Sequence, residues 1–551
     1  MKSRSVLAAA LLAVQLGVAG AHAPEAPTPA TAPAPPVAAP ASVGEVKFAN
    51  SGSPAAQADF AYGLAQLHNF QYPAAAAAFR RAHALDPSFA MAYWGEAMTY
   101  NHPVWMQQDA AAARAVLARL GPDRAARVAK GQTERERAYL DAAEVLYAEQ
   151  GDKFERDKRY ALAMQRLHER WPDDIDGTAF YALSLLGTAH AGRDVATYMK
   201  SFALLDDLFR QYPQHPGITH YLIHSVDDAA HAPLGLQAAR AYGEIAPESS
   251  HALHMSSHIY LALGLWDEVV AANERSLAVA SRRSGMRGAM PMACGHGPIW
   301  LNYGYLQQGR YADAKRLLAE CLALGRQHPG AGTAGEFNPE ASPVGAFYIM
   351  RLRYLLDAPA DAEVMGWTPA ASNLPYAEFL RDYGDAILAV RRQAAGEFAA
   401  AATRARASAA RLRAEIDQAA MPADDTFRRL LAIQLGQLEA AAPLLAGQRA
   451  AGLAQLEAVA REEDVLPAAF GPPQVDEPTR ELLGRLLAAS DPAEARQQFE
   501  RALALNPGRV DPRRGLLAAT RALGDTAEAD AIEAALNDTL RRADAKPGAT
   551  R

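Results

Sequence analysis

Three histidines stand within eight positions in the stretch HALHMSSHIY, residues 251–260, of a chain with only 15 histidines in 551 residues. Neutral imidazole is the commonest protein ligand for transition metals. At about 100° per residue along a helix, these three side chains fall on one face. The stretch therefore has two interpretations, which are a metal site and a set of histidines hydrogen-bonded to one another, to backbone and to water.

The elements that carry these residues are predicted to be helices. Ala-, Leu-, Arg- and Glu-rich segments of roughly 12 to 16 residues follow one another, separated by Pro, Gly or Asp, with no convincing strand alternation. In GLAQLHNFQYPAAAAAFRRAHALDP, Gly63, Phe79 and Pro87 have the spacing of packing residues in a helix hairpin. This stretch resembles a tetratricopeptide repeat, as do later stretches with turn glycines at Gly264 and Gly309 and DPAEARQQFERALALNP near the C-terminus. The resemblance implies an all-α solenoid of stacked helix hairpins, less regular in the C-terminal half.

Repeat spacing adds two histidines to the first three. His254 follows His220 by 34 residues, and His258 follows His224 by 34 residues. One tetratricopeptide repeat has this length, so each pair is expected at equivalent places on stacked helices. In proteins of this fold, these positions line the concave groove.

Numbering from the helix starts adds a sixth histidine. If one repeat begins at Ser250 and the next at Gly295, His251 and His296 both take the second position. Neighbouring helices pack about 8 to 10 Å apart, a gap that two imidazoles can close around one ion. The predicted metal ligands are His220, His224, His251, His254, His258 and His296.

Other donors stand near these histidines in the sequence. A mainly histidine site suits Zn, Cu, Fe or Ni better than Mg or Ca. Asp227 is the best placed oxygen donor, because it follows His224 by three residues, and His215 could orient a ligand or lie in a loop. The remaining candidate donors are Asp228, Glu248, Tyr303 and the sulfur of Cys294.

A closer resemblance covers about residues 60 to 325. The runs HPGITHYLIHSVD and HALHMSSHIYLALG are similar to stretches of a group of bacterial exported tetratricopeptide-repeat proteins. The resemblance places His215 and the six predicted ligands at the histidine positions of the group. One position differs, because the second histidine of the group's last pair is Ile299 here. The resemblance supports the fold and the location of the site and implies no reaction.

The N-terminus predicts export. Residues 1–23 contain Lys2 and Arg4, an apolar run and a small-x-small pattern ending at Ala23, which is typical of a signal peptide. Residues 24–45 form a Pro/Ala-rich linker. No later stretch approaches the ~20 apolar residues that a membrane span needs. We expect a soluble periplasmic or secreted protein, cleaved near Ala23.

The remaining chain divides into a histidine-rich array and a half without histidine. All 15 histidines lie at or before residue 328. We expect a repeat array over 46–328, a Gly/Pro-rich loop over 329–345 and a C-terminal helical region over 346–545. A second Pro-rich break, VLPAAFGPPQVDEPT, spans 465–479.

Charge and cysteine content limit the partners and the chemistry. The net charge of −7, from 62 acidic and 55 basic residues, comes with no basic run, so nucleic acid is not an expected partner. Cys294 and Cys321 could form a disulfide in an oxidising compartment. The chain lacks the H-E-x-x-H, G-x-S-x-G, P-loop and C-x-x-C marks of common enzymes.

Three function classes remain. The favoured one is a scaffold whose groove binds a divalent transition metal through its histidines. A second is an enzyme, hydrolytic or oxidative, that uses this metal to activate water or dioxygen. A third is a metal-free module that holds a peptide or protein in its concave groove.

Overall fold

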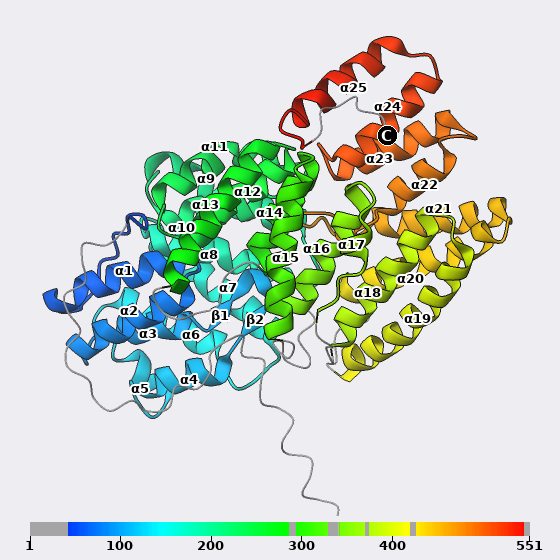
Figure 1. Ribbon diagram of the computed structural model, residues 1–551. Helices are drawn as coiled ribbons and strands as arrows, with labels where there is room; N and C mark the ends of the chain where they lie inside the picture. Colours follow the sequence, from blue (N-terminus) through cyan, green and yellow to red (C-terminus); the bar gives the residue numbers. More distant parts are fainter. Residues whose placement is uncertain are drawn as a thin grey trace, which may run out of the picture.

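The computed structural model describes residues 42–285, 294–328, 340, 342–369, 374–418 and 426–544. The predicted signal peptide, most of the linker and most of the Gly/Pro-rich loop lie outside these residues. Within them the chain forms twenty-five α-helices and one hairpin of two-residue strands, which confirms the predicted all-α fold. Most consecutive helices pack against each other and follow one another across the molecule (Figure 1).

The N-terminal array contains fifteen α-helices, a short hairpin and two 3₁₀ turns. These elements are η1 (Pro54–Ala56), α1 (Gln57–His68), α2 (Tyr72–Leu85), α3 (Ala90–Met98), β1 (Asn101–His102), η2 (Pro103–Trp105), β2 (Gln107–Gln108), α4 (Ala110–Ala118), α5 (Arg124–Val128), α6 (Glu134–Leu146), α7 (Lys153–Arg170), α8 (Ile175–Leu186), α9 (Val195–Gln211), α10 (Pro216–Ser225), α11 (Ala232–Ile245), α12 (Ser250–Ala262), α13 (Trp266–Gly285), α14 (His296–Gln307) and α15 (Tyr311–Gln327). β1 and β2 are antiparallel.

The C-terminal part contains ten further helices in its described residues. These are α16 (Pro343–Asp357), α17 (Ala362–Met365), α18 (Pro375–Arg391), α19 (Ala395–Gln418), α20 (Thr426–Leu445), α21 (Arg449–Asp464), α22 (Thr479–Leu487), α23 (Pro492–Leu505), α24 (Val510–Ala522) and α25 (Thr526–Thr539). The second Pro-rich break therefore forms the loop between α21 and α22.

Buried aromatic side chains pack between the helices of the hairpins, as the repeat pattern predicts. Phe79 of α2 is fully buried between Gly63 of α1 and Gly95 of α3. A Cβ atom on Gly63 would lie 3.0 Å from the Phe79 ring, and one on Gly95 would lie 2.4 Å from it. The small residues are needed because the ring fills the space between the helices.

The C-terminal repeat uses the same packing. Phe499 of α23 lies between Gly484 of α22 and Gly515 of α24, where added Cβ atoms would lie 2.7 and 2.2 Å from its ring. The two turn glycines predicted in the N-terminal array, Gly264 and Gly309, have φ values of +70° and +69°, which a side chain would disfavour. Both turn predictions are confirmed.

The C-terminal helices return to contact the N-terminal array (Figure 1). The indole of Trp266 donates a hydrogen bond to the main-chain oxygen of Gly508, at 2.9 Å. Arg509 donates to the hydroxyl of Tyr303, at 3.0 Å. The loop between α23 and α24 therefore packs directly against α13 and α14.

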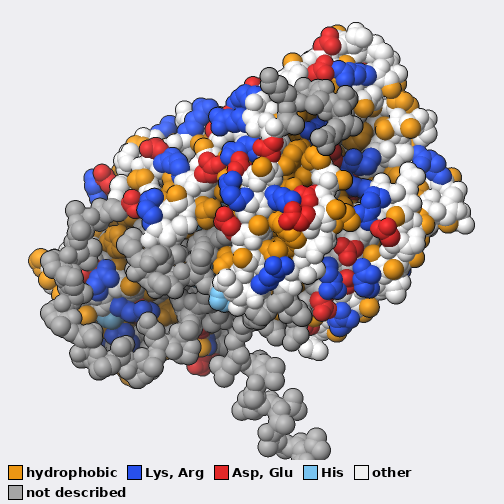
Figure 2. All heavy atoms as spheres, viewed as in Figure 1, with side chains coloured by type: hydrophobic (Ala, Val, Ile, Leu, Met, Phe, Trp, Pro, Cys, Tyr) orange, Lys and Arg blue, Asp and Glu red, His pale blue; other side chains and the backbone are white. Residues whose placement is uncertain are grey.

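Charges of both signs mix over the face shown in Figure 2, and histidine is nearly absent from it. Within the described residues, no helix combines the length and apolar character that a membrane crossing requires.

Candidate metal centre

Three neighbouring helices carry the six predicted ligands. His220 and His224 lie on α10, His251, His254 and His258 on α12, and His296 at the start of α14. As the register predicts, α12 begins at Ser250, where the hydroxyl of Ser249 caps it by accepting from the amide of Ala252.

The six side chains form two compact groups. In each group, one candidate ligand atom per residue lies within 4.8 Å of the other two. The first trio consists of His220, His224 and His251, and the second trio of His254, His258 and His296. The groups adjoin, because the ring centroids of His224 and His258 are 5.3 Å apart. Together they are named the six-histidine cluster.

The cluster lies inside the molecule and does not line an open groove. Four members, His220, His224, His254 and His258, are between 0% and 3% exposed. His251 is partly exposed, and the side chain of His296 is 25% exposed. The predicted concave groove is therefore closed over most of its histidines.

Five of the six rings are held through their Nδ1 atoms by groups that accept hydrogen bonds. The partners are the main-chain oxygen of His68 for His220 (2.6 Å), Asp227 Oδ2 for His224 (3.2 Å) and His258 (2.9 Å), Asn273 Oδ1 for His254 (2.7 Å) and Glu340 Oε2 for His296 (2.5 Å). An acceptor at Nδ1 places the proton there, so that Nε2 of a neutral ring keeps its lone pair. Metal-ligating histidines are commonly held in this way.

Three of the six Nε2 atoms are buried and have no hydrogen-bond partner in the described residues. They belong to His224, His254 and His258. Nε2 of His220 lies 3.2 Å from Nε2 of His251. Burying one polar atom without a partner costs about 1 to 3 kcal/mol. Three such atoms in one cluster fit ligand atoms better than a closed hydrogen-bonded network.

Asp227 links the two trios. Arg193 forms an ion pair with Asp227 and a second, 3.2 Å long, with Asp228. Burial alone would raise the pKa of the Asp227 carboxyl, but the charge of Arg193 and the hydrogen bonds from His224 and His258 hold it well below its usual range. Asp227 is therefore an anion, placed in the loop after α10, which ends at Ser225.

Burial keeps the rings in their ligand form. It is the largest cause that lowers the pKa of His220, His251 and His254 well below the usual value for histidine. Burial also lowers the pKa of His258 to about 4, against the opposing effect of Asp227. Only the neutral imidazole binds a metal ion, so these rings are ready to bind at neutral pH.

Aromatic rings surround both trios. Phe70 packs 4.2 Å from His220, between ring centroids, in the first trio. In the second trio, Trp300 lies 4.4 Å and Phe470 lies 4.9 Å from His258. Phe470 belongs to the loop between α21 and α22, so the histidine-free C-terminal half supplies one wall of the site.

Cavities lie on two sides of this loop. One, of about 230 Å³, is lined by His296, Glu340 and Phe470 together with apolar residues of α18 and α20. The other, of about 240 Å³, is lined by Asp227, Tyr303 and residues of the loop itself. Of the six histidines, only His296 lines either cavity.

His215 joins a different cluster from the six. Its Nε2 lies 3.2 Å from Asp176 Oδ1, and Nε2 of His68 lies 2.8 Å from the same oxygen. Its Nδ1 caps α10 by accepting a hydrogen bond from the amide of Ile218. His215 therefore starts the helix that carries the first trio, and the expectation that it supports a bound ligand stays a prediction.

Three predicted donors are not where the sequence suggests. Glu248 is partly exposed and joins none of the compact groups of candidate ligands in the described residues. The Tyr303 hydroxyl accepts from Arg509 at the contact with the C-terminal helices. Cys294 is bonded to Cys321, so it has no thiolate to offer, and the expected sulfur donor is wrong.

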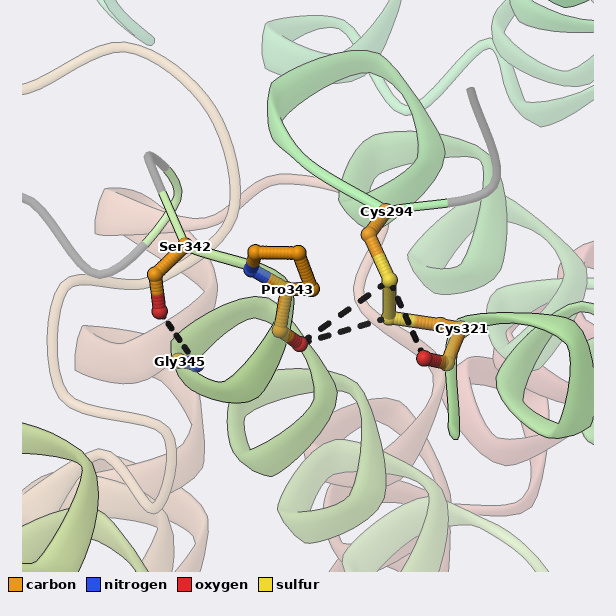
Figure 3. Close-up of a disulfide and its surroundings, with 5 residues drawn as sticks. All are labelled: Cys294, Cys321, Ser342, Pro343 and Gly345. Atoms are coloured by element: carbon orange, nitrogen blue, oxygen red, sulfur yellow. Dashed lines mark hydrogen bonds between the residues drawn. A yellow bond between two sulfur atoms is a disulfide. The ribbon is translucent and has the colours of Figure 1, made fainter. Parts of the chain in front are cut away.

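Figure 3 shows this disulfide beside the start of α16. It joins the residue two before α14 to the middle of α15. The sulfur atoms of Cys294 and Cys321 lie 3.9 and 3.7 Å from the main-chain oxygen of Pro343. The bond therefore ties the segment leading to His296 to the neighbouring helix.

Sequence reasoning missed the groups that contact the six histidines. Besides the aromatic rings of Phe70 and Trp300, they are Arg193, Asn273, Glu340 and Phe470. None shares the repeat spacing of the histidines, and Glu340 and Phe470 come from segments interpreted only as breaks between helices. Only Asn273 carries a usable signal, because a polar residue on the inner face of α13 needs a buried partner.

Comparisons with known proteins give only distant similarities. No family model and no curated protein matches the chain. Among solved structures, a human IFIT1 dimer with m7Gppp-AAAA is 13% identical with a TM-score of 0.36, covering 91% of this chain and 92% of that one. The APC/C hetero-tetramer Cut9-Hcn1 is 12% identical with a TM-score of 0.34, covering 86% and 78%. Yeast Tom70 is 13% identical with a TM-score of 0.27, covering 88% and 92%. Such weak similarities carry no argument about function.

Proposed function

We propose that this protein is an exported helical-repeat scaffold that binds a divalent transition metal through the six-histidine cluster. The observation that carries the proposal is the set of buried Nε2 atoms of His224, His254 and His258, which lack partners in the described residues while acceptors hold their Nδ1 atoms. A ligand set of neutral imidazoles suits Zn, Cu, Fe or Ni.

Two features support export. Residues 1–23 have the charge, the apolar run and the small-x-small pattern of a signal peptide. The disulfide between Cys294 and Cys321 fits an oxidising compartment. Both agree with the resemblance to exported bacterial repeat proteins that carry the same histidine stretches.

A second candidate function is metal-dependent catalysis. The cavity of about 230 Å³ is lined by His296, a member of the second trio, and by its partner Glu340. An ion held by three histidines keeps a coordination position for water or substrate. Helical-repeat scaffolds also bind proteins, but a peptide on the outside would not reach the four buried histidines.

Elemental analysis tests the metal proposal. Residues 24–551 are purified without a polyhistidine tag, dialysed against each candidate metal and analysed by mass spectrometry. We expect near-stoichiometric metal in the wild type and its loss in a variant with His220, His224, His254 and His258 changed to Ala. His168→Ala is the matched control, because His168 contacts Thr178 outside the cluster. A wild-type chain that binds none of the four metals would contradict the proposal.

A further inference from the structure

The two trios share no member, and Asp227 lies between them. We propose that the six-histidine cluster holds two metal ions, one in each trio, as a paired centre. This inference rests on the proposed metal binding and specifies the number and placement of the ions.

The first argument is the distance between the candidate ligand atoms. Every compact group of candidate ligand atoms found in the described residues contains three residues, and none contains four or more of the six histidines. No single position therefore brings all six imidazoles within reach of one ion. One further compact group, His224, Asp227 and His258, spans the two trios, but its carboxylate is already paired with Arg193. A tetrahedral ion takes about four ligands, so three imidazoles per ion leave one position open at each.

The second argument is the position of Asp227. Its Oδ2 accepts hydrogen bonds from Nδ1 of His224, in the first trio, and from Nδ1 of His258, in the second. In each ring Nε2 is the nitrogen left for the ion, and both of these Nε2 atoms are buried without partners in the described residues. One carboxylate thus orients one ligand of each ion. Arg193 occupies the other oxygen, so that Asp227 acts as a positioning residue.

The third argument is that each trio has its own aromatic support. Phe70 packs against His220 and His251 of the first trio, with centroids 4.2 and 5.5 Å away. Trp300 packs against His254 and His258 of the second, at 5.0 and 4.4 Å. Rings fixed by packing and by hydrogen bonds hold two preformed sites, because neither trio needs to borrow a ligand from the other.

Metal stoichiometry tests the pairing. The wild type, a first-trio variant (His220→Gln/His251→Gln) and a second-trio variant (His254→Gln/His296→Gln) are dialysed against Zn²⁺, and zinc per chain is measured. We expect two ions in the wild type and one in each variant, with His168→Gln keeping two. Circular dichroism checks that each chain is folded.

The outcomes separate the two proposals. A wild type that saturates at one ion overturns the pairing and leaves the metal proposal standing, whereas a wild type that binds none overturns both. Loss of all zinc in both variants would show a single shared site. Electron paramagnetic resonance of the Cu²⁺-loaded wild type gives a reading without mutation, since two adjacent ions broaden the spectrum and one isolated ion does not.

Discussion

Two clusters of buried histidines lie next to each other in this protein and differ in what their ring nitrogens do. In the cluster of His68, Asp176 and His215, each ring nitrogen has a partner, including the hydroxyl of Tyr221 for Nδ1 of His68. In the six-histidine cluster, three Nε2 atoms have no partner in the described residues. Similar composition and burial therefore conceal different hydrogen bonding: one cluster is a satisfied network, and the other keeps three buried lone pairs that the proposed metal would use.

The satisfied cluster also positions the other one. The main-chain oxygen of His68 accepts from Nδ1 of His220, and His215 caps α10, the helix that carries the first trio. Asp176 holds His68 and His215 together, and hydrogen bonds from both keep the pKa of its carboxyl below the usual range although burial alone would raise it. The comparison predicts that damage to this cluster lowers stability without removing ligand atoms.

Asp227→Asn should have the largest effect, because it removes the charge that links both trios to Arg193. We expect metal affinity to fall about 10- to 100-fold, as for other residues that orient metal ligands. Breaking a buried ion pair should also lower the free energy of unfolding by about 3 kcal/mol. Competition with a chelator measures the first effect and urea denaturation the second.

Asp228→Asn is the matched control for this change. Asp228 also pairs with Arg193, but its other side-chain partner is His231, which lies outside the cluster. Metal affinity should stay close to that of the wild type. Equal losses of affinity in the two variants would show that the charge of the loop matters and the orientation of His224 and His258 does not.

Removing the metal should have the next largest effect, and it should show which of the two clusters holds the metal. An ion that binds only the folded chain stabilises it by about 2.7 kcal/mol when its free concentration is about 100 times Kd. A chelator should therefore lower the Tm of the wild type, measured by differential scanning calorimetry. The variant with four of the six histidines changed to Ala should show no shift, and an identical shift in both would place the metal elsewhere.

His215→Ala should have a smaller effect, on stability alone. The change removes the cap of α10 and one hydrogen bond to Asp176, which together contribute about 2 kcal/mol. Metal content should not change, whereas His254→Ala should lose metal. Loss of metal in His215→Ala, with the chain folded by circular dichroism, would merge the two clusters into one functional unit.

The helices and the register of the histidines could be predicted from the sequence. Both are local properties, since Gly264 forms the turn between the paired helices α12 and α13, and a 34-residue step from His220 reaches His254 on the next hairpin. Whether the groove is open depends on how far the solenoid curves. The curvature brings Phe470, more than 200 residues away in the chain, against His258.

The partners of the rings could not be predicted for the same reason. Asn273, Glu340 and Arg193 meet the histidines across helix packing angles that no sequence spacing encodes. The pairing of Cys294 with Cys321 depended on a distance that only the folded hairpin sets. Residue type and period therefore pointed to the candidate site, while the tertiary packing decided which nitrogens stay unpaired.

Phe470→Ala should have the smallest effect on stability. Its main effect should be on the rate at which metal leaves the second trio. The ring is only partly buried, so its loss should lower the free energy of unfolding by about 1 kcal/mol. Because it stacks over His258 beside the cavity that His296 lines, its removal should speed release of metal from the second trio without changing the amount bound. Absorbance of a colorimetric chelator after rapid mixing follows that release. Leu466→Ala, in the same loop but on the side of the other cavity, should release metal at the wild-type rate. Equal rates in all three chains would mean that the loop does not control access to the histidines and that the ions leave by another route.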